Sequence, residues 1–462
     1  MSQKGTRDMT VGSTRRHIIA FAIPIFLSNL LQQLYNTADA FIVGNFDSTE
    51  SLAAVSSSGS LIFLFTGFFT GVSLGAGVLI ARYYGARAYE KMQKTIHTAV
   101  ALGVVTGILL SVFGIVFSSQ VLTLMRTDPE VLPKSVSYFR IYFAGAIFTI
   151  LYNMFTAVLN ALGDSRRPLY YLIVSSCLNV VLDIIFVAVF RMGVEGAAVA
   201  SVISQAVSAT LCFFYLIRPG TIYTLRIREI RFHRGYLADI LRYGIPTGVQ
   251  NSVIGLANVI VQSNINTFGK AAMAGCGTYS KIEGFAFLPI TCFAMALSTF
   301  VGQNLGAGKK DRVREGTVFG IILSVVMAEI IGALFYLFAP TLISLFDSNP
   351  AVTAFGVEQA RTESMFYFLL AFSHCIAGIC RGAGKATVPM FIMLGVWCVL
   401  RITYITVILR YIPEIRMIFW AYPLTWGISS VIFLFYYIFC DWKNAFNKPK
   451  KTAARFRRKQ EG

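Results

Sequence analysis

The sequence predicts an all-α integral membrane protein with twelve transmembrane helices in two six-helix bundles. Three observations predict this fold: the composition, a series of long apolar runs, and an internal duplication. The chain of 462 residues is 56% hydrophobic and 13% charged, with a mean hydropathy of +0.65. A soluble domain of this size is far more polar, so the helices are expected to lie in a lipid bilayer.

Apolar runs of about 18 residues or more recur along the whole chain, and each is long enough to cross a bilayer as a helix. We expect helices near residues 17–43, 52–81, 95–118, 136–160, 168–190, 194–217, 238–268, 273–301, 315–339, 362–380, 387–409 and 416–440.

Lysine and arginine alternate between the loops that join these runs. One set of loops carries most of the positive charge, including Arg82, Arg87, Arg166, Arg167, Arg226, Arg228, Lys309, Lys310, Arg381, Lys385 and the basic C-terminal tail. The positive-inside rule assigns this set, and both termini, to the cytoplasmic side. The net charge of +18 is therefore explained by topology. It favours contact between the tail and anionic membrane lipid, and it disfavours nucleic acid as a partner.

The chain repeats itself at a spacing of 221 or 222 residues. Equivalent pairs are Pro129 and Pro350, Gly163 and Gly384, Pro168 and Pro389, and Pro24 and Pro246. Six helices are an even number, so both copies enter the membrane in the same orientation and are related by a pseudo-two-fold axis along the membrane normal. We predict an N-terminal lobe at 1–222, a basic cytoplasmic linker at 223–236, a C-terminal lobe at 237–441 and a tail at 442–462. The substrate site is expected between the lobes.

Four motifs in order carry a family resemblance: IPIFLSNLLQQLYNTADAFIVG, LNALGDSRRP, NVVLDIIF and GQNLGAGKKDRVREG. Together with the duplication, they make the chain similar to multidrug and toxic compound extrusion (MATE) transporters over nearly its whole length. The resemblance implies two bundles arranged as a V. It also implies export of organic, often cationic amphipathic compounds in exchange for H⁺ or Na⁺.

Two polar stripes end in carboxylates inside apolar helices. Helical spacing places Gln32, Asn36 and Asp39 on one face of the first helix, and Asn179 and Asp183 on one face of the fifth. An aspartate at the centre of a membrane helix costs about 2.5 to 3.5 kcal/mol, which makes it a functional-site hypothesis. Both carboxylates fall at similar depth, so we expect one shared pocket. Carboxylate, amide and hydroxyl oxygens suit Na⁺ and equally a proton.

The MATE resemblance implies roles for individual residues. It assigns cation coupling to Asp39, Asn179, Asp183 and Ser201, with Na⁺ held by the first three. It implies that the substrate cavity includes Tyr35 and Asn153, and that Pro24 bends the first helix during gating. Further cavity residues expected from the polar stripes are Asn36, Asn258 and Gln262. No catalytic residue and no cofactor other than the coupling ion is expected.

Structural alternatives accompany each of these roles. Asn179 and Asp183 are also compatible with polar contacts that hold helices together, which contribute only ~0.6 kcal/mol on average. An amide or hydroxyl would do this without an ionisation cost, which favours function for Asp183. Pro24 is equally compatible with a tolerated kink. The serine stripe from Ser201 to Ser208 fits close helix packing as well as ion binding.

The second copy lacks the acids of the first. Val261 aligns with Asp39, Leu400 with Asn179 and Tyr404 with Asp183. This pattern resembles the DinF-like bacterial branch of the family, in which the coupling acids lie in the N-terminal lobe. Coupling is therefore expected on one side only.

The second copy contains other charges at apparent membrane depth: Lys281, Glu283, Glu329 and Arg401. Intramembrane charges usually pair, so a structural cluster with an ion pair between Glu283 and Arg401 is the first interpretation. The alternative is that Arg401 or Lys281 faces the central cavity and admits anionic substrates.

The function that follows is a cation-coupled antiporter exporting organic, cationic amphipathic compounds by alternating access. The alternative within transporters is a flippase of a lipid-linked oligosaccharide, and an ion channel or receptor is the rival of another class. The segment at Gly382–Lys385 lacks the spacing of a phosphate-binding loop, and no nucleophile with a base is found, so an enzyme is not expected. We expect a functional monomer in a bacterial plasma membrane.

Overall fold

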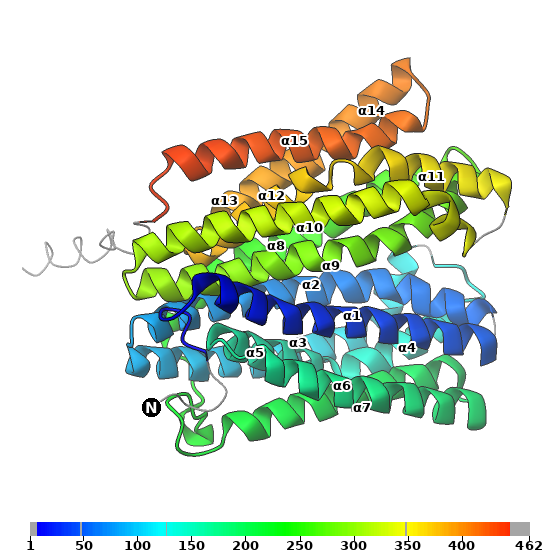
Figure 1. Ribbon diagram of the computed structural model, residues 1–462. Helices are drawn as coiled ribbons and strands as arrows, with labels where there is room; N and C mark the ends of the chain where they lie inside the picture. Colours follow the sequence, from blue (N-terminus) through cyan, green and yellow to red (C-terminus); the bar gives the residue numbers. More distant parts are fainter. Residues whose placement is uncertain (1–6, 47–48, 126, 347–348, 444–462) are drawn as a thin grey trace, which may run out of the picture.

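The computed structural model describes residues 7–46, 49–125, 127–346 and 349–443. These residues fold into helices, which Figure 1 shows packed side by side. The N-terminal half contains α1 (Thr14–Phe46), α2 (Thr49–Gly85), α3 (Tyr89–Leu124), α4 (Leu132–Ala144), α5 (Ala146–Ala161), α6 (Arg166–Asp183), the π-helix η1 (Ile184–Val189) and α7 (Gly193–Leu216). A 3₁₀ turn, η2 (Ile227–Glu229), lies in the linker. The C-terminal half contains α8 (Arg234–Asn266), α9 (Lys270–Gly306), α10 (Lys310–Ser344), α11 (Pro350–Ser364), α12 (Tyr367–Gly382), α13 (Thr387–Met393), the π-helix η3 (Leu394–Leu400), α14 (Arg401–Tyr411) and α15 (Arg416–Phe439).

The prediction of twelve membrane-spanning helices in two bundles is confirmed. In the described part of the chain, nine helices are long and apolar enough to span a bilayer. The pairs α4 with α5 and α11 with α12 add two bent spans, with angles of 47° and 56°. The twelfth is α8, whose Asn251, Asn258 and Gln262 make it more polar. Several helices are longer than predicted, because hydropathy marks only the part that contacts lipid and helices continue beyond it.

The two lobes meet along α2 and α8, which pack closely through paired glycines. Figure 1 shows the N-terminal lobe in the lower half of the view and the C-terminal lobe in the upper half. A Cβ atom on Gly71 would lie 2.3 Å from the Gly248 nitrogen, and one on Gly75 would lie 2.3 Å from the Gly244 nitrogen. Small residues spaced four apart allow two helix backbones to approach this closely.

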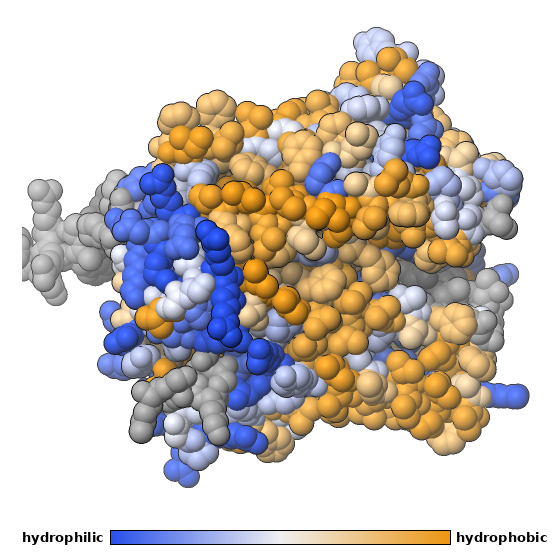
Figure 2. All heavy atoms as spheres, viewed as in Figure 1, coloured by the Kyte–Doolittle hydropathy of each residue, from blue (hydrophilic) through white to orange (hydrophobic). Residues whose placement is uncertain are grey.

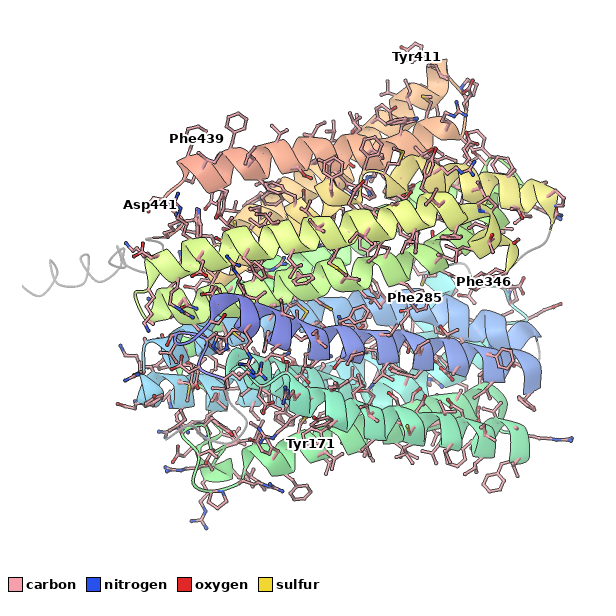
Figure 3. All side chains as sticks on the ribbon, viewed as in Figure 1. Tyr171, Phe285, Phe346, Tyr411, Phe439 and Asp441 are labelled. Carbon is pink, nitrogen blue, oxygen red and sulfur yellow. The ribbon has the colours of Figure 1, made fainter. Side chains whose placement is uncertain are left out.

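Polar and apolar side chains are separated along the molecule. Figure 2 shows hydrophilic residues gathered at the end near the N-terminus, and a broad apolar belt across the middle of the view. We call the hydrophilic end the basic end. Aromatic side chains mark both ends in Figure 3, with Phe439 at the basic end and Tyr411 at the opposite end; these are 75% and 79% exposed. Exposed aromatic residues at both ends are typical of membrane interfaces.

At the basic end, the segment before α1 joins the lobes. The Met9 backbone N–H donates to Gln303 Oε1 at 3.0 Å, and Arg312 donates to the Met9 and Gly12 carbonyls at 3.0 and 2.8 Å. Gln303 Nε2 also donates to the Ala161 carbonyl in the other lobe at 2.8 Å. These contacts hold the two lobes together at this end. The tail beyond Lys443 lies outside the described residues.

Candidate functional site

The N-terminal lobe contains a buried polar pocket formed by α1, α6 and α7. Asp39 on α1 is 8% exposed, and Asn179 and Asp183 on α6 are 1% and 0% exposed. The charges of Asp39 and Asp183 lie close enough to interact. The structure therefore brings together the two carboxylates that the sequence placed in one pocket.

These polar atoms have no partners within the described residues. Both Asp183 carboxylate oxygens, both polar atoms of the Asn179 amide and Oδ1 of Asp39 are buried without a hydrogen bond. From α7, Ser204 Oγ and Gln205 Oε1 are in the same condition. A buried polar atom without a partner is costly, and a buried charge costs more. Contacts within the protein therefore leave the polar atoms of this pocket without partners, which a purely structural role does not explain.

The local backbone is unusual directly after Asp183. Asn179 and Asp183 are four residues apart on α6, so they share one face of the helix. The helix then widens into the π-helix η1 at Ile184. Such widened turns occur mostly as single insertions in α-helices and often at functional sites, because they change the direction of the neighbouring side chains.

The donor set fits a hard cation or protons. Four oxygen-bearing side chains, Asp39, Asn179, Asp183 and Ser204, supply carboxylate, amide and hydroxyl oxygens, which are the ligands that Na⁺ accepts. Within the described ranges no cluster of three or more His, Cys, Asp or Glu residues forms a site typical of a transition metal. The pocket can therefore take up a small cation and neutralise its own carboxylates.

Other predicted site residues lie at varying distances from this pocket. Tyr35 lies beside Gln32 and Gln205, within the electrostatic reach of both aspartates. Ser201 is 8% exposed, but its hydroxyl is not among the unpartnered atoms, and its role in coupling stays a prediction. Pro24 is buried inside α1, where the Ser28 hydroxyl donates to its carbonyl at 2.9 Å.

The predicted cavity residues differ in exposure. Asn36 and Asn258 are exposed, whereas Asn153 and Gln262 are partly buried. Gln262 Nε2 donates to Asn266 Oδ1 at 3.0 Å on its own helix. Exposed amides on membrane-spanning helices indicate a surface that water reaches.

The C-terminal lobe contains a second buried acid cluster, built around Glu363 on α11. Glu363 is 0% exposed, and its carboxylate accepts from Gln359 Nε2 at 2.8 Å and from the Tyr279 hydroxyl at 3.4 Å. Tyr279 also contacts Glu283 at 3.3 Å and the Tyr367 hydroxyl at 2.9 Å. The Tyr279 hydroxyl therefore lies between the two carboxyl groups. The sequence analysis missed Glu363, although Gln359, Glu363 and Tyr367 recur every fourth residue.

The predicted ion pair between Glu283 and Arg401 is wrong as a direct contact. No such ion pair exists between these two described residues. Instead, Arg401 donates to Thr425 Oγ1 at 3.1 and 2.7 Å, and its guanidinium lies 4.2 Å from the centre of the Tyr422 ring. The charges of both glutamates reach Arg401 only at longer range. The hydroxyl and the ring occupy the positions that a carboxylate would take.

The remaining intramembrane charges lie elsewhere. Lys281 and Glu329 are exposed and do not take part in this cluster. Arg401 is 3% exposed, so it does not face a central cavity.

Comparison with known proteins gives the family of the chain. The family model described as MatE matches twice, at residues 24–185 and 246–407, so the matches begin 222 residues apart. The chain is 28% identical over 447 residues to "Probable multidrug resistance protein YoeA" of Bacillus subtilis (strain 168), covering 95% of this chain and 96% of that protein. It is 22% identical over 381 residues to "Multidrug export protein MepA" of Staphylococcus aureus (strain NCTC 8325 / PS 47), with coverage of 81% and 83%.

Solved structures have the same fold. A MOP superfamily transporter from Pyrococcus furiosus Vc1 (DSM3638), described as having a binding pocket of reverse polarity, superposes with a TM-score of 0.90. It is 22% identical, with 97% of this chain and 100% of that chain covered. A multidrug resistance MATE family transporter of the MOP superfamily in an outward-facing conformation gives a TM-score of 0.88, 23% identity and coverage of 94% and 97%. Taken with the family-model matches to both halves, these likenesses show that the chain belongs to the MatE family of multidrug and toxic compound extrusion transporters.

Proposed function

We propose that this protein exports organic amphipathic compounds, including cationic ones, in exchange for H⁺ or Na⁺ bound at the pocket of Asp39, Asn179 and Asp183. The observation that carries the proposal is the set of buried, unpartnered polar atoms on these three residues. An exchanged cation supplies the missing partner in one state of the cycle and leaves in the other. The names of the relatives, which describe multidrug resistance and export, support export of organic compounds over lipid flipping.

The cycle that we propose is alternating access between two rigid lobes, 1–222 and 237–441, joined by the linker 223–236. Cation binding neutralises the acid pocket and changes the packing of α1 against α6, while substrate binds the opposite state better. Coupling needs only this difference in affinity, because a ligand that binds both states equally shifts nothing. Pro24 removes one backbone hydrogen bond from α1 and gives that helix a position at which to bend.

The charge pattern and the bacterial relatives support a proposal for the membrane setting. We propose that the basic end faces the cytoplasm of a bacterium and that the protein acts as a monomer in the plasma membrane. The basic tail would contact anionic lipid at that surface. The protein performs transport and no covalent chemistry.

The experiment is transport by purified protein in liposomes. A Na⁺ gradient and a pH gradient are applied separately, and accumulation of a fluorescent cationic dye is followed. The wild type is expected to accumulate dye with one of the two gradients, and Asp183→Asn is expected to accumulate none. Glu329→Gln is the matched control, because it removes an exposed membrane carboxylate outside the pocket. Equal accumulation by wild type and Asp183→Asn would reject the proposed coupling site.

A further inference from the structure

A small cavity lies between the two lobes on the basic side of the interface. Its walls come from α1, α2, α5, α8, α9 and α12, so both lobes contribute. It has a volume of about 50 Å³, and its polar lining includes Asn160, Tyr243, Thr247, Ser298, Thr299 and Arg381. Of the described residues that line this cavity, Arg381 alone is charged. The cavity therefore has a positive charge and no acid to balance it.

Arg381 lies in the last turn of α12 and is partly buried. Within the described chain its guanidinium makes no ion pair and no hydrogen bond, although a guanidinium carries five N–H donors. The end of a helix offers partial negative charge to a nearby cation, but this is weaker than a carboxylate. Arg401, by contrast, has both a hydroxyl and an aromatic ring as partners.

The internal repeat places a second polar group at the same cavity. Asn160 precedes Arg381 by 221 residues, so the two positions are equivalent in the two halves. Oδ1 of Asn160 is buried without a hydrogen bond. The two lobes therefore present one amide and one guanidinium to a shared space, and neither is satisfied by the other.

The size of the cavity limits what fits. A cavity of this volume holds a few water molecules or a single small polar group. A carboxylate or a phosphate is of this size, and a guanidinium binds either one through two parallel hydrogen bonds. The hydroxyl groups of Ser298 and Thr299 offer further donors to an anion.

We propose that Arg381 binds an anionic group of the exported compound, so that carboxylate-bearing or phosphate-bearing amphipaths are preferred over their neutralised analogues. This rests on the proposed export function and narrows its substrate class. A compound with both a protonated amine and an acid group fits a cation-exchanging transporter with this subsite. When the lobes part at the basic end, Arg381 meets the anionic group, and the rest of the compound lies along the lobe interface.

The test uses two dyes that differ by one ester. Rhodamine 110 carries a free carboxylate, and rhodamine 123 is its methyl ester. Dissociation constants are measured by fluorescence polarisation with the purified full chain in detergent. The wild type is expected to bind rhodamine 110 about tenfold more tightly than rhodamine 123, and Arg381→Gln is expected to bind the two equally. A tenfold preference that persists in Arg381→Gln, or its absence from the wild type, would overturn the proposal.

Further variants separate this proposal from its alternatives. Arg381→Lys keeps the charge and is expected to retain part of the preference, whereas loss of rhodamine 123 binding in both Arg381 variants would indicate a structural role and overturn the proposal. Lys270→Gln removes an exposed cation at the start of α9, outside the cavity, and should leave both constants unchanged. Competition by benzoate or by phenyl phosphate identifies which anion binds, and no competition by either would contradict an anion site.

The proposed function and this inference fail in different ways. If Asp183→Asn still couples transport to a cation, the coupling site is wrong, but the preference for rhodamine 110 stands. If Arg381→Gln keeps the preference while Asp183→Asn loses coupling, the anion subsite alone is rejected.

Discussion

The two lobes each bury a pair of acids, and the pairs differ in what surrounds them. In the C-terminal lobe, Glu363 accepts hydrogen bonds from Gln359 and Tyr279, and the Tyr279 hydroxyl also contacts Glu283. The charge of Arg401 acts on Glu363 at longer range. In the N-terminal lobe, Asp183 has no hydrogen-bond partner among the described residues. The C-terminal cluster contains its own donors, whereas the N-terminal pocket must obtain its partner from outside.

This difference indicates that the two copies of the duplicated bundle have different roles. A permanently satisfied acid pair stabilises a lobe and has no need to exchange ions. An acid pair without hydrogen-bond partners in the protein is free to bind a cation from solution. Both buried charges also adjoin a π-helix, because η1 begins after Asp183 and η3 ends before Arg401. The same local distortion thus positions an acid in one lobe and a cation in the other.

The largest effect is expected for transport by Asp183→Asn. This change removes the charge that binds the coupling cation, so cation-driven dye accumulation should fall by about 100-fold, near the upper end of known coupling energies. The free energy of unfolding should not fall, because the carboxylate has no bonds to lose. Accumulation in liposomes checks the first statement. Unimpaired transport by this variant would contradict a coupling role for the N-terminal acid pair.

A smaller effect, on stability, is expected for Glu363→Leu. The leucine leaves Gln359 and Tyr279 without their acceptor, which should lower the free energy of unfolding by about 2 kcal/mol. Titration with sodium dodecyl sulfate in mixed micelles gives this quantity. Glu363→Gln is the milder control, since its single amide oxygen still accepts one of the two bonds. If instead Glu363→Gln abolishes coupling without loss of stability, the C-terminal cluster is a transport site as well.

Smaller effects, with the same difference between the two lobes, are expected for Tyr367 and Tyr35. Tyr367→Phe removes a hydroxyl that bonds Tyr279 at 2.9 Å, and should cost about 1 kcal/mol of stability. Tyr35→Phe removes a hydroxyl beside the buried N-terminal pocket and should change stability little while weakening cation binding. Unfolding and cation titration of the two variants side by side test this. A larger stability loss at Tyr35 than at Tyr367 would reverse the expected pattern.

The smallest effect concerns the two α7 serines. Ser204→Ala removes an unpartnered hydroxyl at the pocket and should weaken cation binding by about threefold, the cost of one modest hydrogen bond. Ser201→Ala should have less effect than this, although family resemblance favours Ser201. Cation-dependent protection against thermal unfolding compares them. A larger loss of cation binding in Ser201→Ala than in Ser204→Ala would assign the coupling hydroxyl to Ser201.

Much of the fold could be predicted from the sequence, because hydropathy and the 221-residue repeat are strong signals. The repeat pairs of proline and glycine anticipated two bundles, and the spacing of Asn179 and Asp183 anticipated a shared buried face with Asp39. The breaks between α4 and α5 and between α11 and α12 left no clear signal in hydropathy, because each pair taken together is apolar enough to form one span.

The parts that sequence reasoning missed depend on tertiary contacts. Glu363 lies beside polar residues in the last turn of α11, and its position there does not mark it as part of a buried cluster. The ion pair of Arg401 with Glu283 was expected because charges in membranes pair. In the structure, Thr425 and Tyr422 on α15 contact the guanidinium instead. Arg381 was counted among loop cations, and only the packing of α12 and α5 against α9 brings it to a cavity shared with Asn160.

The most direct test of the central claim is the effect of cations on substrate affinity. The dissociation constant of a cationic dye is measured in wild type, Asp183→Asn and Glu363→Gln, with Na⁺ and pH varied separately. Antiport requires that the coupling cation weaken dye binding, and linkage makes this effect reciprocal. We predict weakening in wild type and Glu363→Gln, and none in Asp183→Asn. Weakening that persists in Asp183→Asn but disappears in Glu363→Gln would contradict the account and assign coupling to the C-terminal lobe.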